Sequence, residues 1–184
     1  MKKLLLLSMA LLLVANANAD SPTIGLYADE LATVRYAGVT PYVQLDLYLI
    51  ATWPDGTDLA SGITAAEFKM ENLPANVGYP TGTVTVVATT DLIIGDLWTD
   101  WSAAWSTPQG AGVGYFNMAT LEILAFDAGW IPDGHVTTAA LGDDCGCMQL
   151  VDWLFEKHDA VGESFYFSSV ASEPTSWGTV KSLF

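Results

Sequence analysis

Apolar and polar residues alternate with a period of two along much of this chain. In residues 41–51, PYVQLDLYLIA, apolar side chains occupy every second position from Val43 to Leu49. This pattern predicts a β-strand with one buried face. Other short segments show the same alternation or a β-branched run, with Gly, Pro and Asp turn residues between them. They are 23–29, 65–74, 82–90, 119–126, 135–141 and 163–170.

The spacing of these segments predicts the fold class. About seven to nine short strands separated by turns are expected of an all-β chain that folds as a two-sheet antiparallel β-sandwich. Segment 119–126, ATLEILAF, is apolar on both faces except for Glu122, which predicts a central strand. We expect one or two short helical turns besides the strands.

Two segments fit more than one structure. In 96–105, DLWTDWSAAW, Trp98, Trp101 and Trp105 stand at positions i, i+3 and i+7, and a short helix is favoured there.

The second ambiguous segment is 148–157, MQLVDWLFEK. It fits either a strand that buries Val151, Trp153 and Phe155 or a helical turn capped by Asp143 or Asp144. The strand is favoured.

The chain begins with a pattern typical of a secretory signal. Two lysines precede an apolar run from Leu4 to Val14, and small residues end at Ala19. We expect cleavage near Ala19 and a mature protein that is secreted, extracellular or periplasmic, with no membrane span. Residues 20–173 then form one domain. The end, 174–184, is either a last strand or a sorting tail.

The charge of the chain excludes one class of partner. The formal net charge is −15, and removal of the signal leaves four basic residues against 21 acidic ones, a net charge of −17. Such a surface repels phosphate backbones, so nucleic acid is excluded as a partner.

The residue pattern does not indicate an enzyme. His135 and His158 are the two imidazoles, and neither lies in a G-x-S-x-G or cysteine-protease motif. Asp96 and Asp100 beside the tryptophans resemble a glycosidase pair, but among 21 acids such pairs arise by chance. A secreted hydrolase is therefore the third alternative.

Tryptophan is the stronger functional signal, with seven in 184 residues. Aromatic faces stack on the apolar faces of sugar rings and also pack in cores. Trp98, Trp101 and Trp105 are the candidate ligand-binding residues, as a platform for polysaccharide. The alternative is that they close one end of the sandwich.

The remaining candidate chemistry lies in loops. No cofactor is expected, and calcium is the ion that the acidic loops fit best, although their spacing matches no EF-hand. The weak candidate ligands are Asp55, Asp58, Asp143 and Asp144.

Cys145 and Cys147 are the only cysteines, and outside the cytoplasm a disulfide between them is expected to brace a tight turn. Three alternatives stay open, namely a redox pair, a metal site with His135 and His158, and intermolecular bonding. The neighbouring acids disfavour a reactive thiolate, and the spacing fits no standard zinc motif.

Several segments carry a resemblance to known proteins. IGLYAD, LDLYLIA followed by GITAAEFKMENLP, and TSWGTVKSLF resemble uncharacterised secreted β-sandwich proteins of bacteria. In architecture, the succession of strands is similar to immunoglobulin-like, cohesin-like and carbohydrate-binding sandwiches. The resemblance implies a binding module rather than a catalyst.

These observations together predict a secreted non-enzymatic binding module of the cell surface or extracellular space. Its expected partner is a polysaccharide or a cell-surface protein. The alternative is a structural or self-assembling extracellular protein, which a long bare sheet edge favours.

Overall fold

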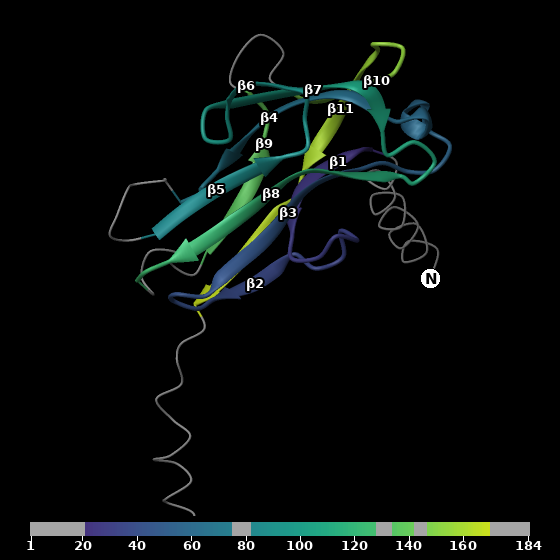
Figure 1. Cartoon of the computed structure of the whole chain (residues 1–184). Helices are drawn as coiled ribbons and strands as arrows, with labels where there is room; N and C mark the ends of the chain where they lie inside the picture. The colour runs from purple at the N-terminus through teal and green to yellow at the C-terminus, as the bar shows by residue number, and fades with distance from the viewer. Residues whose placement is uncertain (1–20, 75–81, 128–133, 142–146, 170–184) are drawn as a thin grey trace, which may run out of the picture.

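The computed structural model describes residues 21–74, 82–127, 134–141 and 147–169, and it shows an all-β, mostly antiparallel sandwich (Figure 1). These residues form twelve strands and one short 3-10 turn, η1. Their bounds are β1 Thr23–Tyr27, β2 Tyr36–Val39, β3 Gln44–Thr52, η1 Asp58–Ser61, β4 Ile63–Glu71, β5 Gly82–Ala88, β6 Leu92–Asp96, β7 Asp100–Gln109, β8 Tyr115–Ala125, β9 Gly134–Ala139, β10 Met148–Asp152, β11 Lys157–Gly162 and β12 Ser164–Ser169.

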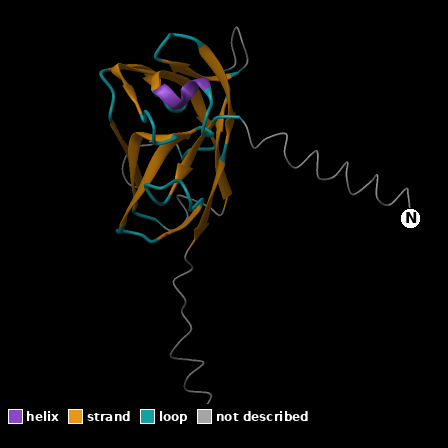
Figure 2. Ribbon diagram, turned by 90° about the vertical axis from the view of Figure 1, so that its right-hand side faces the viewer, coloured by secondary structure: helices purple, strands orange, loops and turns teal. Residues whose placement is uncertain are grey.

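The two layers belong to one hydrogen-bonded path. The strand order is β2-β12-β9-β4-β10-β11-β1-β3-β8-β5, with β7 and then β6 added on β4. Figure 1 shows β4, β6, β7 and β10 in the upper layer and β3, β5 and β8 in the lower layer. The path crosses between the layers where β11 pairs with β1, and this pair is parallel, as is β12 with β2. Figure 2 shows the strands forming the framework, with loops at their ends.

The core lies between the layers and follows the alternation in the sequence. Leu47 and Leu49 of β3 are fully buried, and Phe68 and Met70 of β4 are 0% and 3% exposed. The prediction of a central strand at 119–126 is confirmed, because β8 pairs with β3 on one side and β5 on the other. Glu122 lies on its outer side, half-buried.

The prediction of seven to nine strands was too low, and the short helix at 96–105 was wrong. The segment is the turn of a hairpin followed by the start of β7, in which Trp101, Ala103 and Trp105 alternate inward. Residues four apart share a face in a helix and also in a strand, so the Trp101–Trp105 spacing fits both. The turn itself is closed by Asp96, whose Oδ1 accepts the N–H groups of Trp98 and Thr99 at 2.8 and 2.9 Å.

The strand favoured at 148–157 is confirmed only as far as Asp152, and its expected buried face was wrong. Leu150 is fully buried, whereas Val151 faces outward and is half-buried. Trp153 and Phe155 are exposed because the chain turns after Asp152.

Several predictions fall outside the described residues. These are the signal at 1–19 with its cleavage site, the tail at 174–184, and Asp143, Asp144 and Cys145. Within the described ranges, no helix is long and apolar enough to span a bilayer.

Candidate functional site

The outer face of the upper layer carries an apolar row across four strands. Cross-strand pairing aligns Leu92 of β6 with Ala104 of β7, Ala104 with Ala65 of β4, and Ala65 with Val151 of β10. The side chains of such a row stand side by side on one face. The next row begins with Ile94 and Ser102 and then becomes polar at Glu67.

These residues enclose a shallow groove of about 150 Å³, which we call the outer trough. Its floor is formed by the small side chains of Ala65, Ala104 and Ser102, and larger apolar side chains stand on both sides. On the β6 side, Leu92 and Ile94 are 55% and 62% exposed. The strands β6 and β10 are three inter-strand spacings apart, which is about 14 Å, and an α-helix with its side chains is about 10–12 Å wide.

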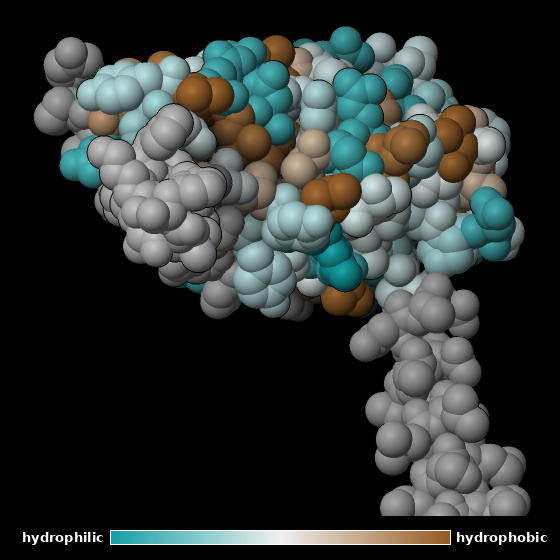
Figure 3. Space-filling view, turned by 90° about the horizontal axis from the view of Figure 1, so that it is seen from below, coloured by the Kyte–Doolittle hydropathy of each residue, from teal (hydrophilic) through white to brown (hydrophobic). Residues whose placement is uncertain are grey.

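The outer face of the lower layer is different. Its cross-strand row joins Asp46 of β3, Glu122 of β8 and Thr85 of β5. Two carboxylates therefore stand where the upper layer carries alanines. Figure 3, seen from below Figure 1, shows apolar side chains in separate groups among polar ones.

Asp96 adds a negative charge beside the trough. Burial alone raises the pKa of its carboxyl group, but hydrogen bonds from the N–H groups of Trp98 and Thr99 and from the Thr99 hydroxyl lower it below its usual value. Asp96 therefore stays ionised, and it lies opposite Asp100 at the end of the β6–β7 hairpin. The lining of the trough is apolar except for Ser102 and Glu67, and the two aspartates add negative charge at this end.

A second apolar feature projects beside the trough. The turn between β10 and β11 presents Trp153, Leu154 and Phe155 in sequence, exposed by 50%, 58% and 79%. Figure 1 shows this yellow-green turn rising above the upper layer. Phe155 has φ of 65°, a left-handed conformation that a bulky residue rarely adopts. We call these three residues the apolar tip.

Asp152 holds the apolar tip in shape. Its carboxylate oxygen Oδ1 accepts the N–H groups of Leu154 and Glu156 at 2.8 and 2.9 Å, and Oδ2 lies 3.2 Å from Nε2 of His158. The Thr64 hydroxyl donates to the carbonyl of Asp152 at 2.7 Å. The tip is therefore fixed from the core side.

The Asp152–His158 pair resembles the acid and the histidine of a hydrolytic triad, but it has no nucleophile beside it among the described residues. In the described part of the chain, no hydroxyl or thiol is hydrogen-bonded to His158. The Asp152 side chain is 2% exposed and that of His158 is 21% exposed, so the pair lies beneath the turn. His158 is thus largely buried, and its contact with Asp152 stabilises the turn. The side chain of His135 lies outside the described residues.

The tryptophan platform predicted from the sequence does not form. Trp101 and Trp105 are 1% and 5% exposed and pack in the core, where the Trp101 ring centroid lies 4.9 Å from that of Phe68. Trp98 is half-buried, and its Nε1–H donates to the carbonyl of Pro74. The alternative prediction was that these indoles close one end of the sandwich, and the burial of Trp101 and Trp105 agrees with its expectation of packing rather than ligand binding.

The loop candidates for metal and sulfur chemistry are placed in part. Asp55 and Asp58 are exposed, and among the described residues no three His, Cys, Asp or Glu side chains gather as a metal site. Cys147 is disulfide-bonded, and its sulfur accepts a hydrogen bond from Nε2 of Gln149 at 3.2 Å. Because Cys145 is not among the described residues, the pairing of the two cysteines stays a prediction.

Sequence reasoning missed the residues of the outer trough. Leu92, Ile94 and Val151 are ordinary strand residues in the sequence, and Ala65 and Ala104 carry no chemical signal at all. Only the order β6-β7-β4-β10 brings them together. One signal was present for the tip, since three consecutive large apolar residues between Asp152 and Glu156 are unusual for a turn.

Comparison with known proteins finds likeness in structure alone. No protein-family model matches the chain, and no curated protein matches it. Among solved structures, it is similar to a cohesin module from a family 33 glycoside hydrolase of Clostridium perfringens ATCC13124, with 9% identity, 81% of this chain and 96% of that chain covered, and a TM-score of 0.46. It is also similar to a type III cohesin module from the cellulosomal ScaE cell-surface anchoring scaffoldin of Ruminococcus flavefaciens, with 12% identity, 83% and 89% covered, and a TM-score of 0.40.

The structural likeness to cohesin modules agrees with the similarity in architecture expected from the sequence. At these identities and TM-scores it carries no conclusion about activity or partners. The resemblance to secreted bacterial proteins stays a prediction.

Proposed function

We propose that the protein is a non-enzymatic extracellular module that binds a partner protein through the outer trough. The observation that carries this proposal is the contrast between the two outer faces. An apolar row crosses four strands on one face, and the equivalent row on the other face carries Asp46 and Glu122. Contiguous apolar surface rimmed by polar residues is typical of a protein–protein interaction site.

The shape of the trough favours a helical partner. Its small-residue floor admits the apolar ridge of an amphipathic helix, and Leu92 and Val151 contact the two sides of that ridge. In helix-in-groove recognition of this kind, the partner helix contacts the groove through apolar residues at its positions i, i+3, i+4 and i+7. Because Asp96 and Asp100 mark one end of the trough, a partner helix with a basic residue at that end is preferred.

A charge placed on the trough floor tests the proposal. Ala65→Arg/Ala104→Arg puts two guanidinium groups into the apolar row, and both positions point away from the core. Thr85→Arg/Thr120→Arg on the opposite outer face is the matched control, since it adds the same charge.

The wild type, the trough variant and the control are each immobilised and exposed to the proteins secreted by the bacterium that makes this protein. Each retained protein is identified, and its affinity for the three immobilised proteins is measured by titration. We expect a protein that binds the wild type and the control saturably and binds the trough variant at least tenfold more weakly. The proposal is wrong if every retained protein binds the wild type, the control and the trough variant alike. It is also wrong if no retained protein binds both the wild type and the control.

A further inference from the structure

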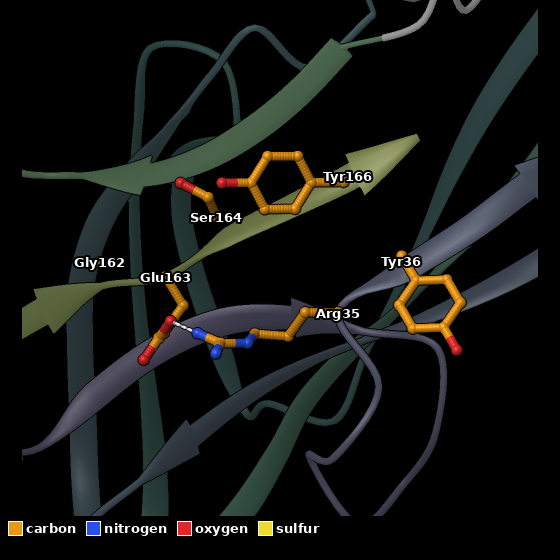
Figure 4. A pocket seen from close by; sticks show the side chains of 6 residues that line it. All are labelled: Arg35, Tyr36, Gly162, Glu163, Ser164 and Tyr166. Atoms are coloured by element: carbon orange, nitrogen blue, oxygen red, sulfur yellow. Dashed lines mark hydrogen bonds and ion pairs between the residues drawn. The ribbon is translucent and has the colours of Figure 1, made fainter. Parts of the chain in front are cut away.

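A hollow unrelated to the trough lies where β2 meets β12. It has a volume of about 570 Å³. Figure 4 shows the residues that line it: Arg35, Tyr36, Gly162, Glu163, Ser164 and Tyr166. The trough is built by β4, β6, β7 and β10, so the two surfaces share no residue.

Two exposed tyrosines border this hollow. Parallel pairing of β12 with β2 sets Tyr166 beside Tyr36, and the two side chains are 58% and 71% exposed. In Figure 4 the Tyr166 ring extends toward Ser164, whereas the Tyr36 ring stands on the other side of Arg35. The hollow therefore offers two separate aromatic surfaces.

An ion pair lines the same hollow. Arg35, the only arginine of the chain, is hydrogen-bonded to the carboxylate of Glu163, and the two side chains are 50% and 26% exposed. An exposed pair of this kind contributes little to stability. Its planar groups instead present hydrogen-bond donors and acceptors of known direction to a ligand.

The backbone of Glu163 is fixed before any ligand arrives. Its N–H donates to the carbonyl of Ile24 at 2.9 Å and also faces the hydroxyl of Thr138 at 3.0 Å. Gly25 makes room for this residue, because a Cβ at that position would lie 2.6 Å from the Cβ of Glu163. On the other side of the hollow, the N–H of Tyr166 donates to the carbonyl of Arg35 at 3.0 Å.

We propose that this hollow binds a neutral saccharide through Tyr36, Tyr166 and the Arg35–Glu163 pair. A sugar ring has an apolar C–H face that stacks on an aromatic ring. Its vicinal hydroxyls accept from a guanidinium and donate to a carboxylate, and the Arg35–Glu163 pair supplies both groups in the lining of the hollow.

Charge selects the class of saccharide. The Arg35–Glu163 pair is neutral as a unit, and the chain around it carries a net charge of −15. An anionic sugar polymer is repelled by such a surface. β-linked hexoses and pentoses with equatorial hydroxyls fit best, because both faces of their rings are flat and apolar.

Calorimetric titration of the whole protein with cellohexaose, xylohexaose and hexagalacturonate tests this site. We expect binding of at least one of the two neutral hexasaccharides and none of the anionic one. Tyr36→Ala, Tyr166→Ala and Arg35→Gln each weaken that binding about tenfold, which corresponds to the loss of one stacking contact or one charged hydrogen bond. Tyr166→Phe retains most of it.

Two controls accompany these variants. Tyr42→Ala removes a tyrosine that is 75% exposed and packs near Phe126 outside the hollow, and it leaves binding unchanged. Ala65→Arg/Ala104→Arg also leaves saccharide binding unchanged, so the saccharide proposal and the trough proposal can be refuted separately. The proposal is overturned if neither neutral hexasaccharide binds at millimolar concentration, if hexagalacturonate binds as well, or if the tyrosine and arginine variants bind like the wild type.

Discussion

Replacing Asp152 by alanine tests whether the hydrogen bonds of its carboxylate stabilise the turn that carries the apolar tip. The substitution removes the acceptor of two backbone N–H groups, at 2.8 Å from Leu154 and 2.9 Å from Glu156, and the partner of His158 at 3.2 Å. The carboxylate is 2% exposed, so water reaches it poorly in the wild type.

The expected loss follows from these contacts. A hydrogen bond to a charged group contributes about 1.5–3 kcal/mol, and a local side-chain acceptor for backbone N–H groups contributes about 1 kcal/mol. Leu154 and Glu156 lie at an exposed turn where water replaces part of what is lost. We therefore expect Asp152→Ala to lower the free energy of unfolding by about 2–4 kcal/mol and Asp152→Asn, which keeps one acceptor oxygen, by about 1 kcal/mol.

The pH dependence of this loss is a second observable. Burial, the largest single influence, raises the pKa of Asp152, but the N–H of Glu156, the ring of His158, the N–H of Leu154 and the charge of His158 together lower it below its usual value. A carboxyl group with a lowered folded-state pKa stabilises above its unfolded pKa of about 3.9, and the stabilisation is lost as the pH falls through the folded value. The difference between wild type and Asp152→Asn is therefore full at pH 7 and vanishes in strong acid.

Urea unfolding followed by tryptophan fluorescence at pH 7, 5 and 3 measures both effects. Exposed Asp55→Ala is the control and leaves the midpoint unchanged. The reasoning fails if Asp152→Ala costs less than about 0.5 kcal/mol at pH 7, or if the cost of Asp152→Asn is the same at pH 7 and pH 3.

Three further outcomes are expected. Phe155→Gly relieves the positive φ and raises the free energy of unfolding by up to about 1 kcal/mol, and a loss of that size in urea titration contradicts it. Trp101→Ala empties a core site beside Phe68 and costs about 3–5 kcal/mol, whereas a near-neutral result refutes its burial. Mass spectrometry without reduction finds the mature chain monomeric and two hydrogens lighter than its reduced form, and free thiols at Cys145 and Cys147 refute the pairing.

Periodicity predicted the parts of the fold that depend on local alternation. The inward faces of β3 and β4 follow directly from Leu47 and Phe68, because the neighbours of each residue in the strand are more polar. The error at Trp101 and Trp105 has a physical origin, since residues four apart share a face both in a helix and in a strand. Ala103 between them occupies the inward position that only a strand predicts, but its small side chain gave a weaker signal than the two indoles.

The candidate sites depend on long-range pairing, which alternation does not encode. Tyr36 and Tyr166 are 130 positions apart and meet only because β12 pairs with β2 in parallel. Ala65 and Ala104 become a trough floor only through the β4–β7 register. Sequence reasoning singled out Trp101 and Trp105, which lie in the core, whereas the trough floor is formed by small residues that carry no such signal.

The parallel pairing of β1 with β11 also determines how the sandwich carries mechanical tension. Figure 1 shows β1 starting at one end of the sandwich and the yellow end of β12 at the other. Tension between Thr23 and Ser169 slides β1 along β11, so the hydrogen bonds from the N–H groups of Val161 and Glu163 to the carbonyls of Pro22 and Ile24 lengthen together. They share the load instead of opening one at a time, and the lifetime of the fold under tension is then governed by its unfolding rate rather than by its equilibrium stability.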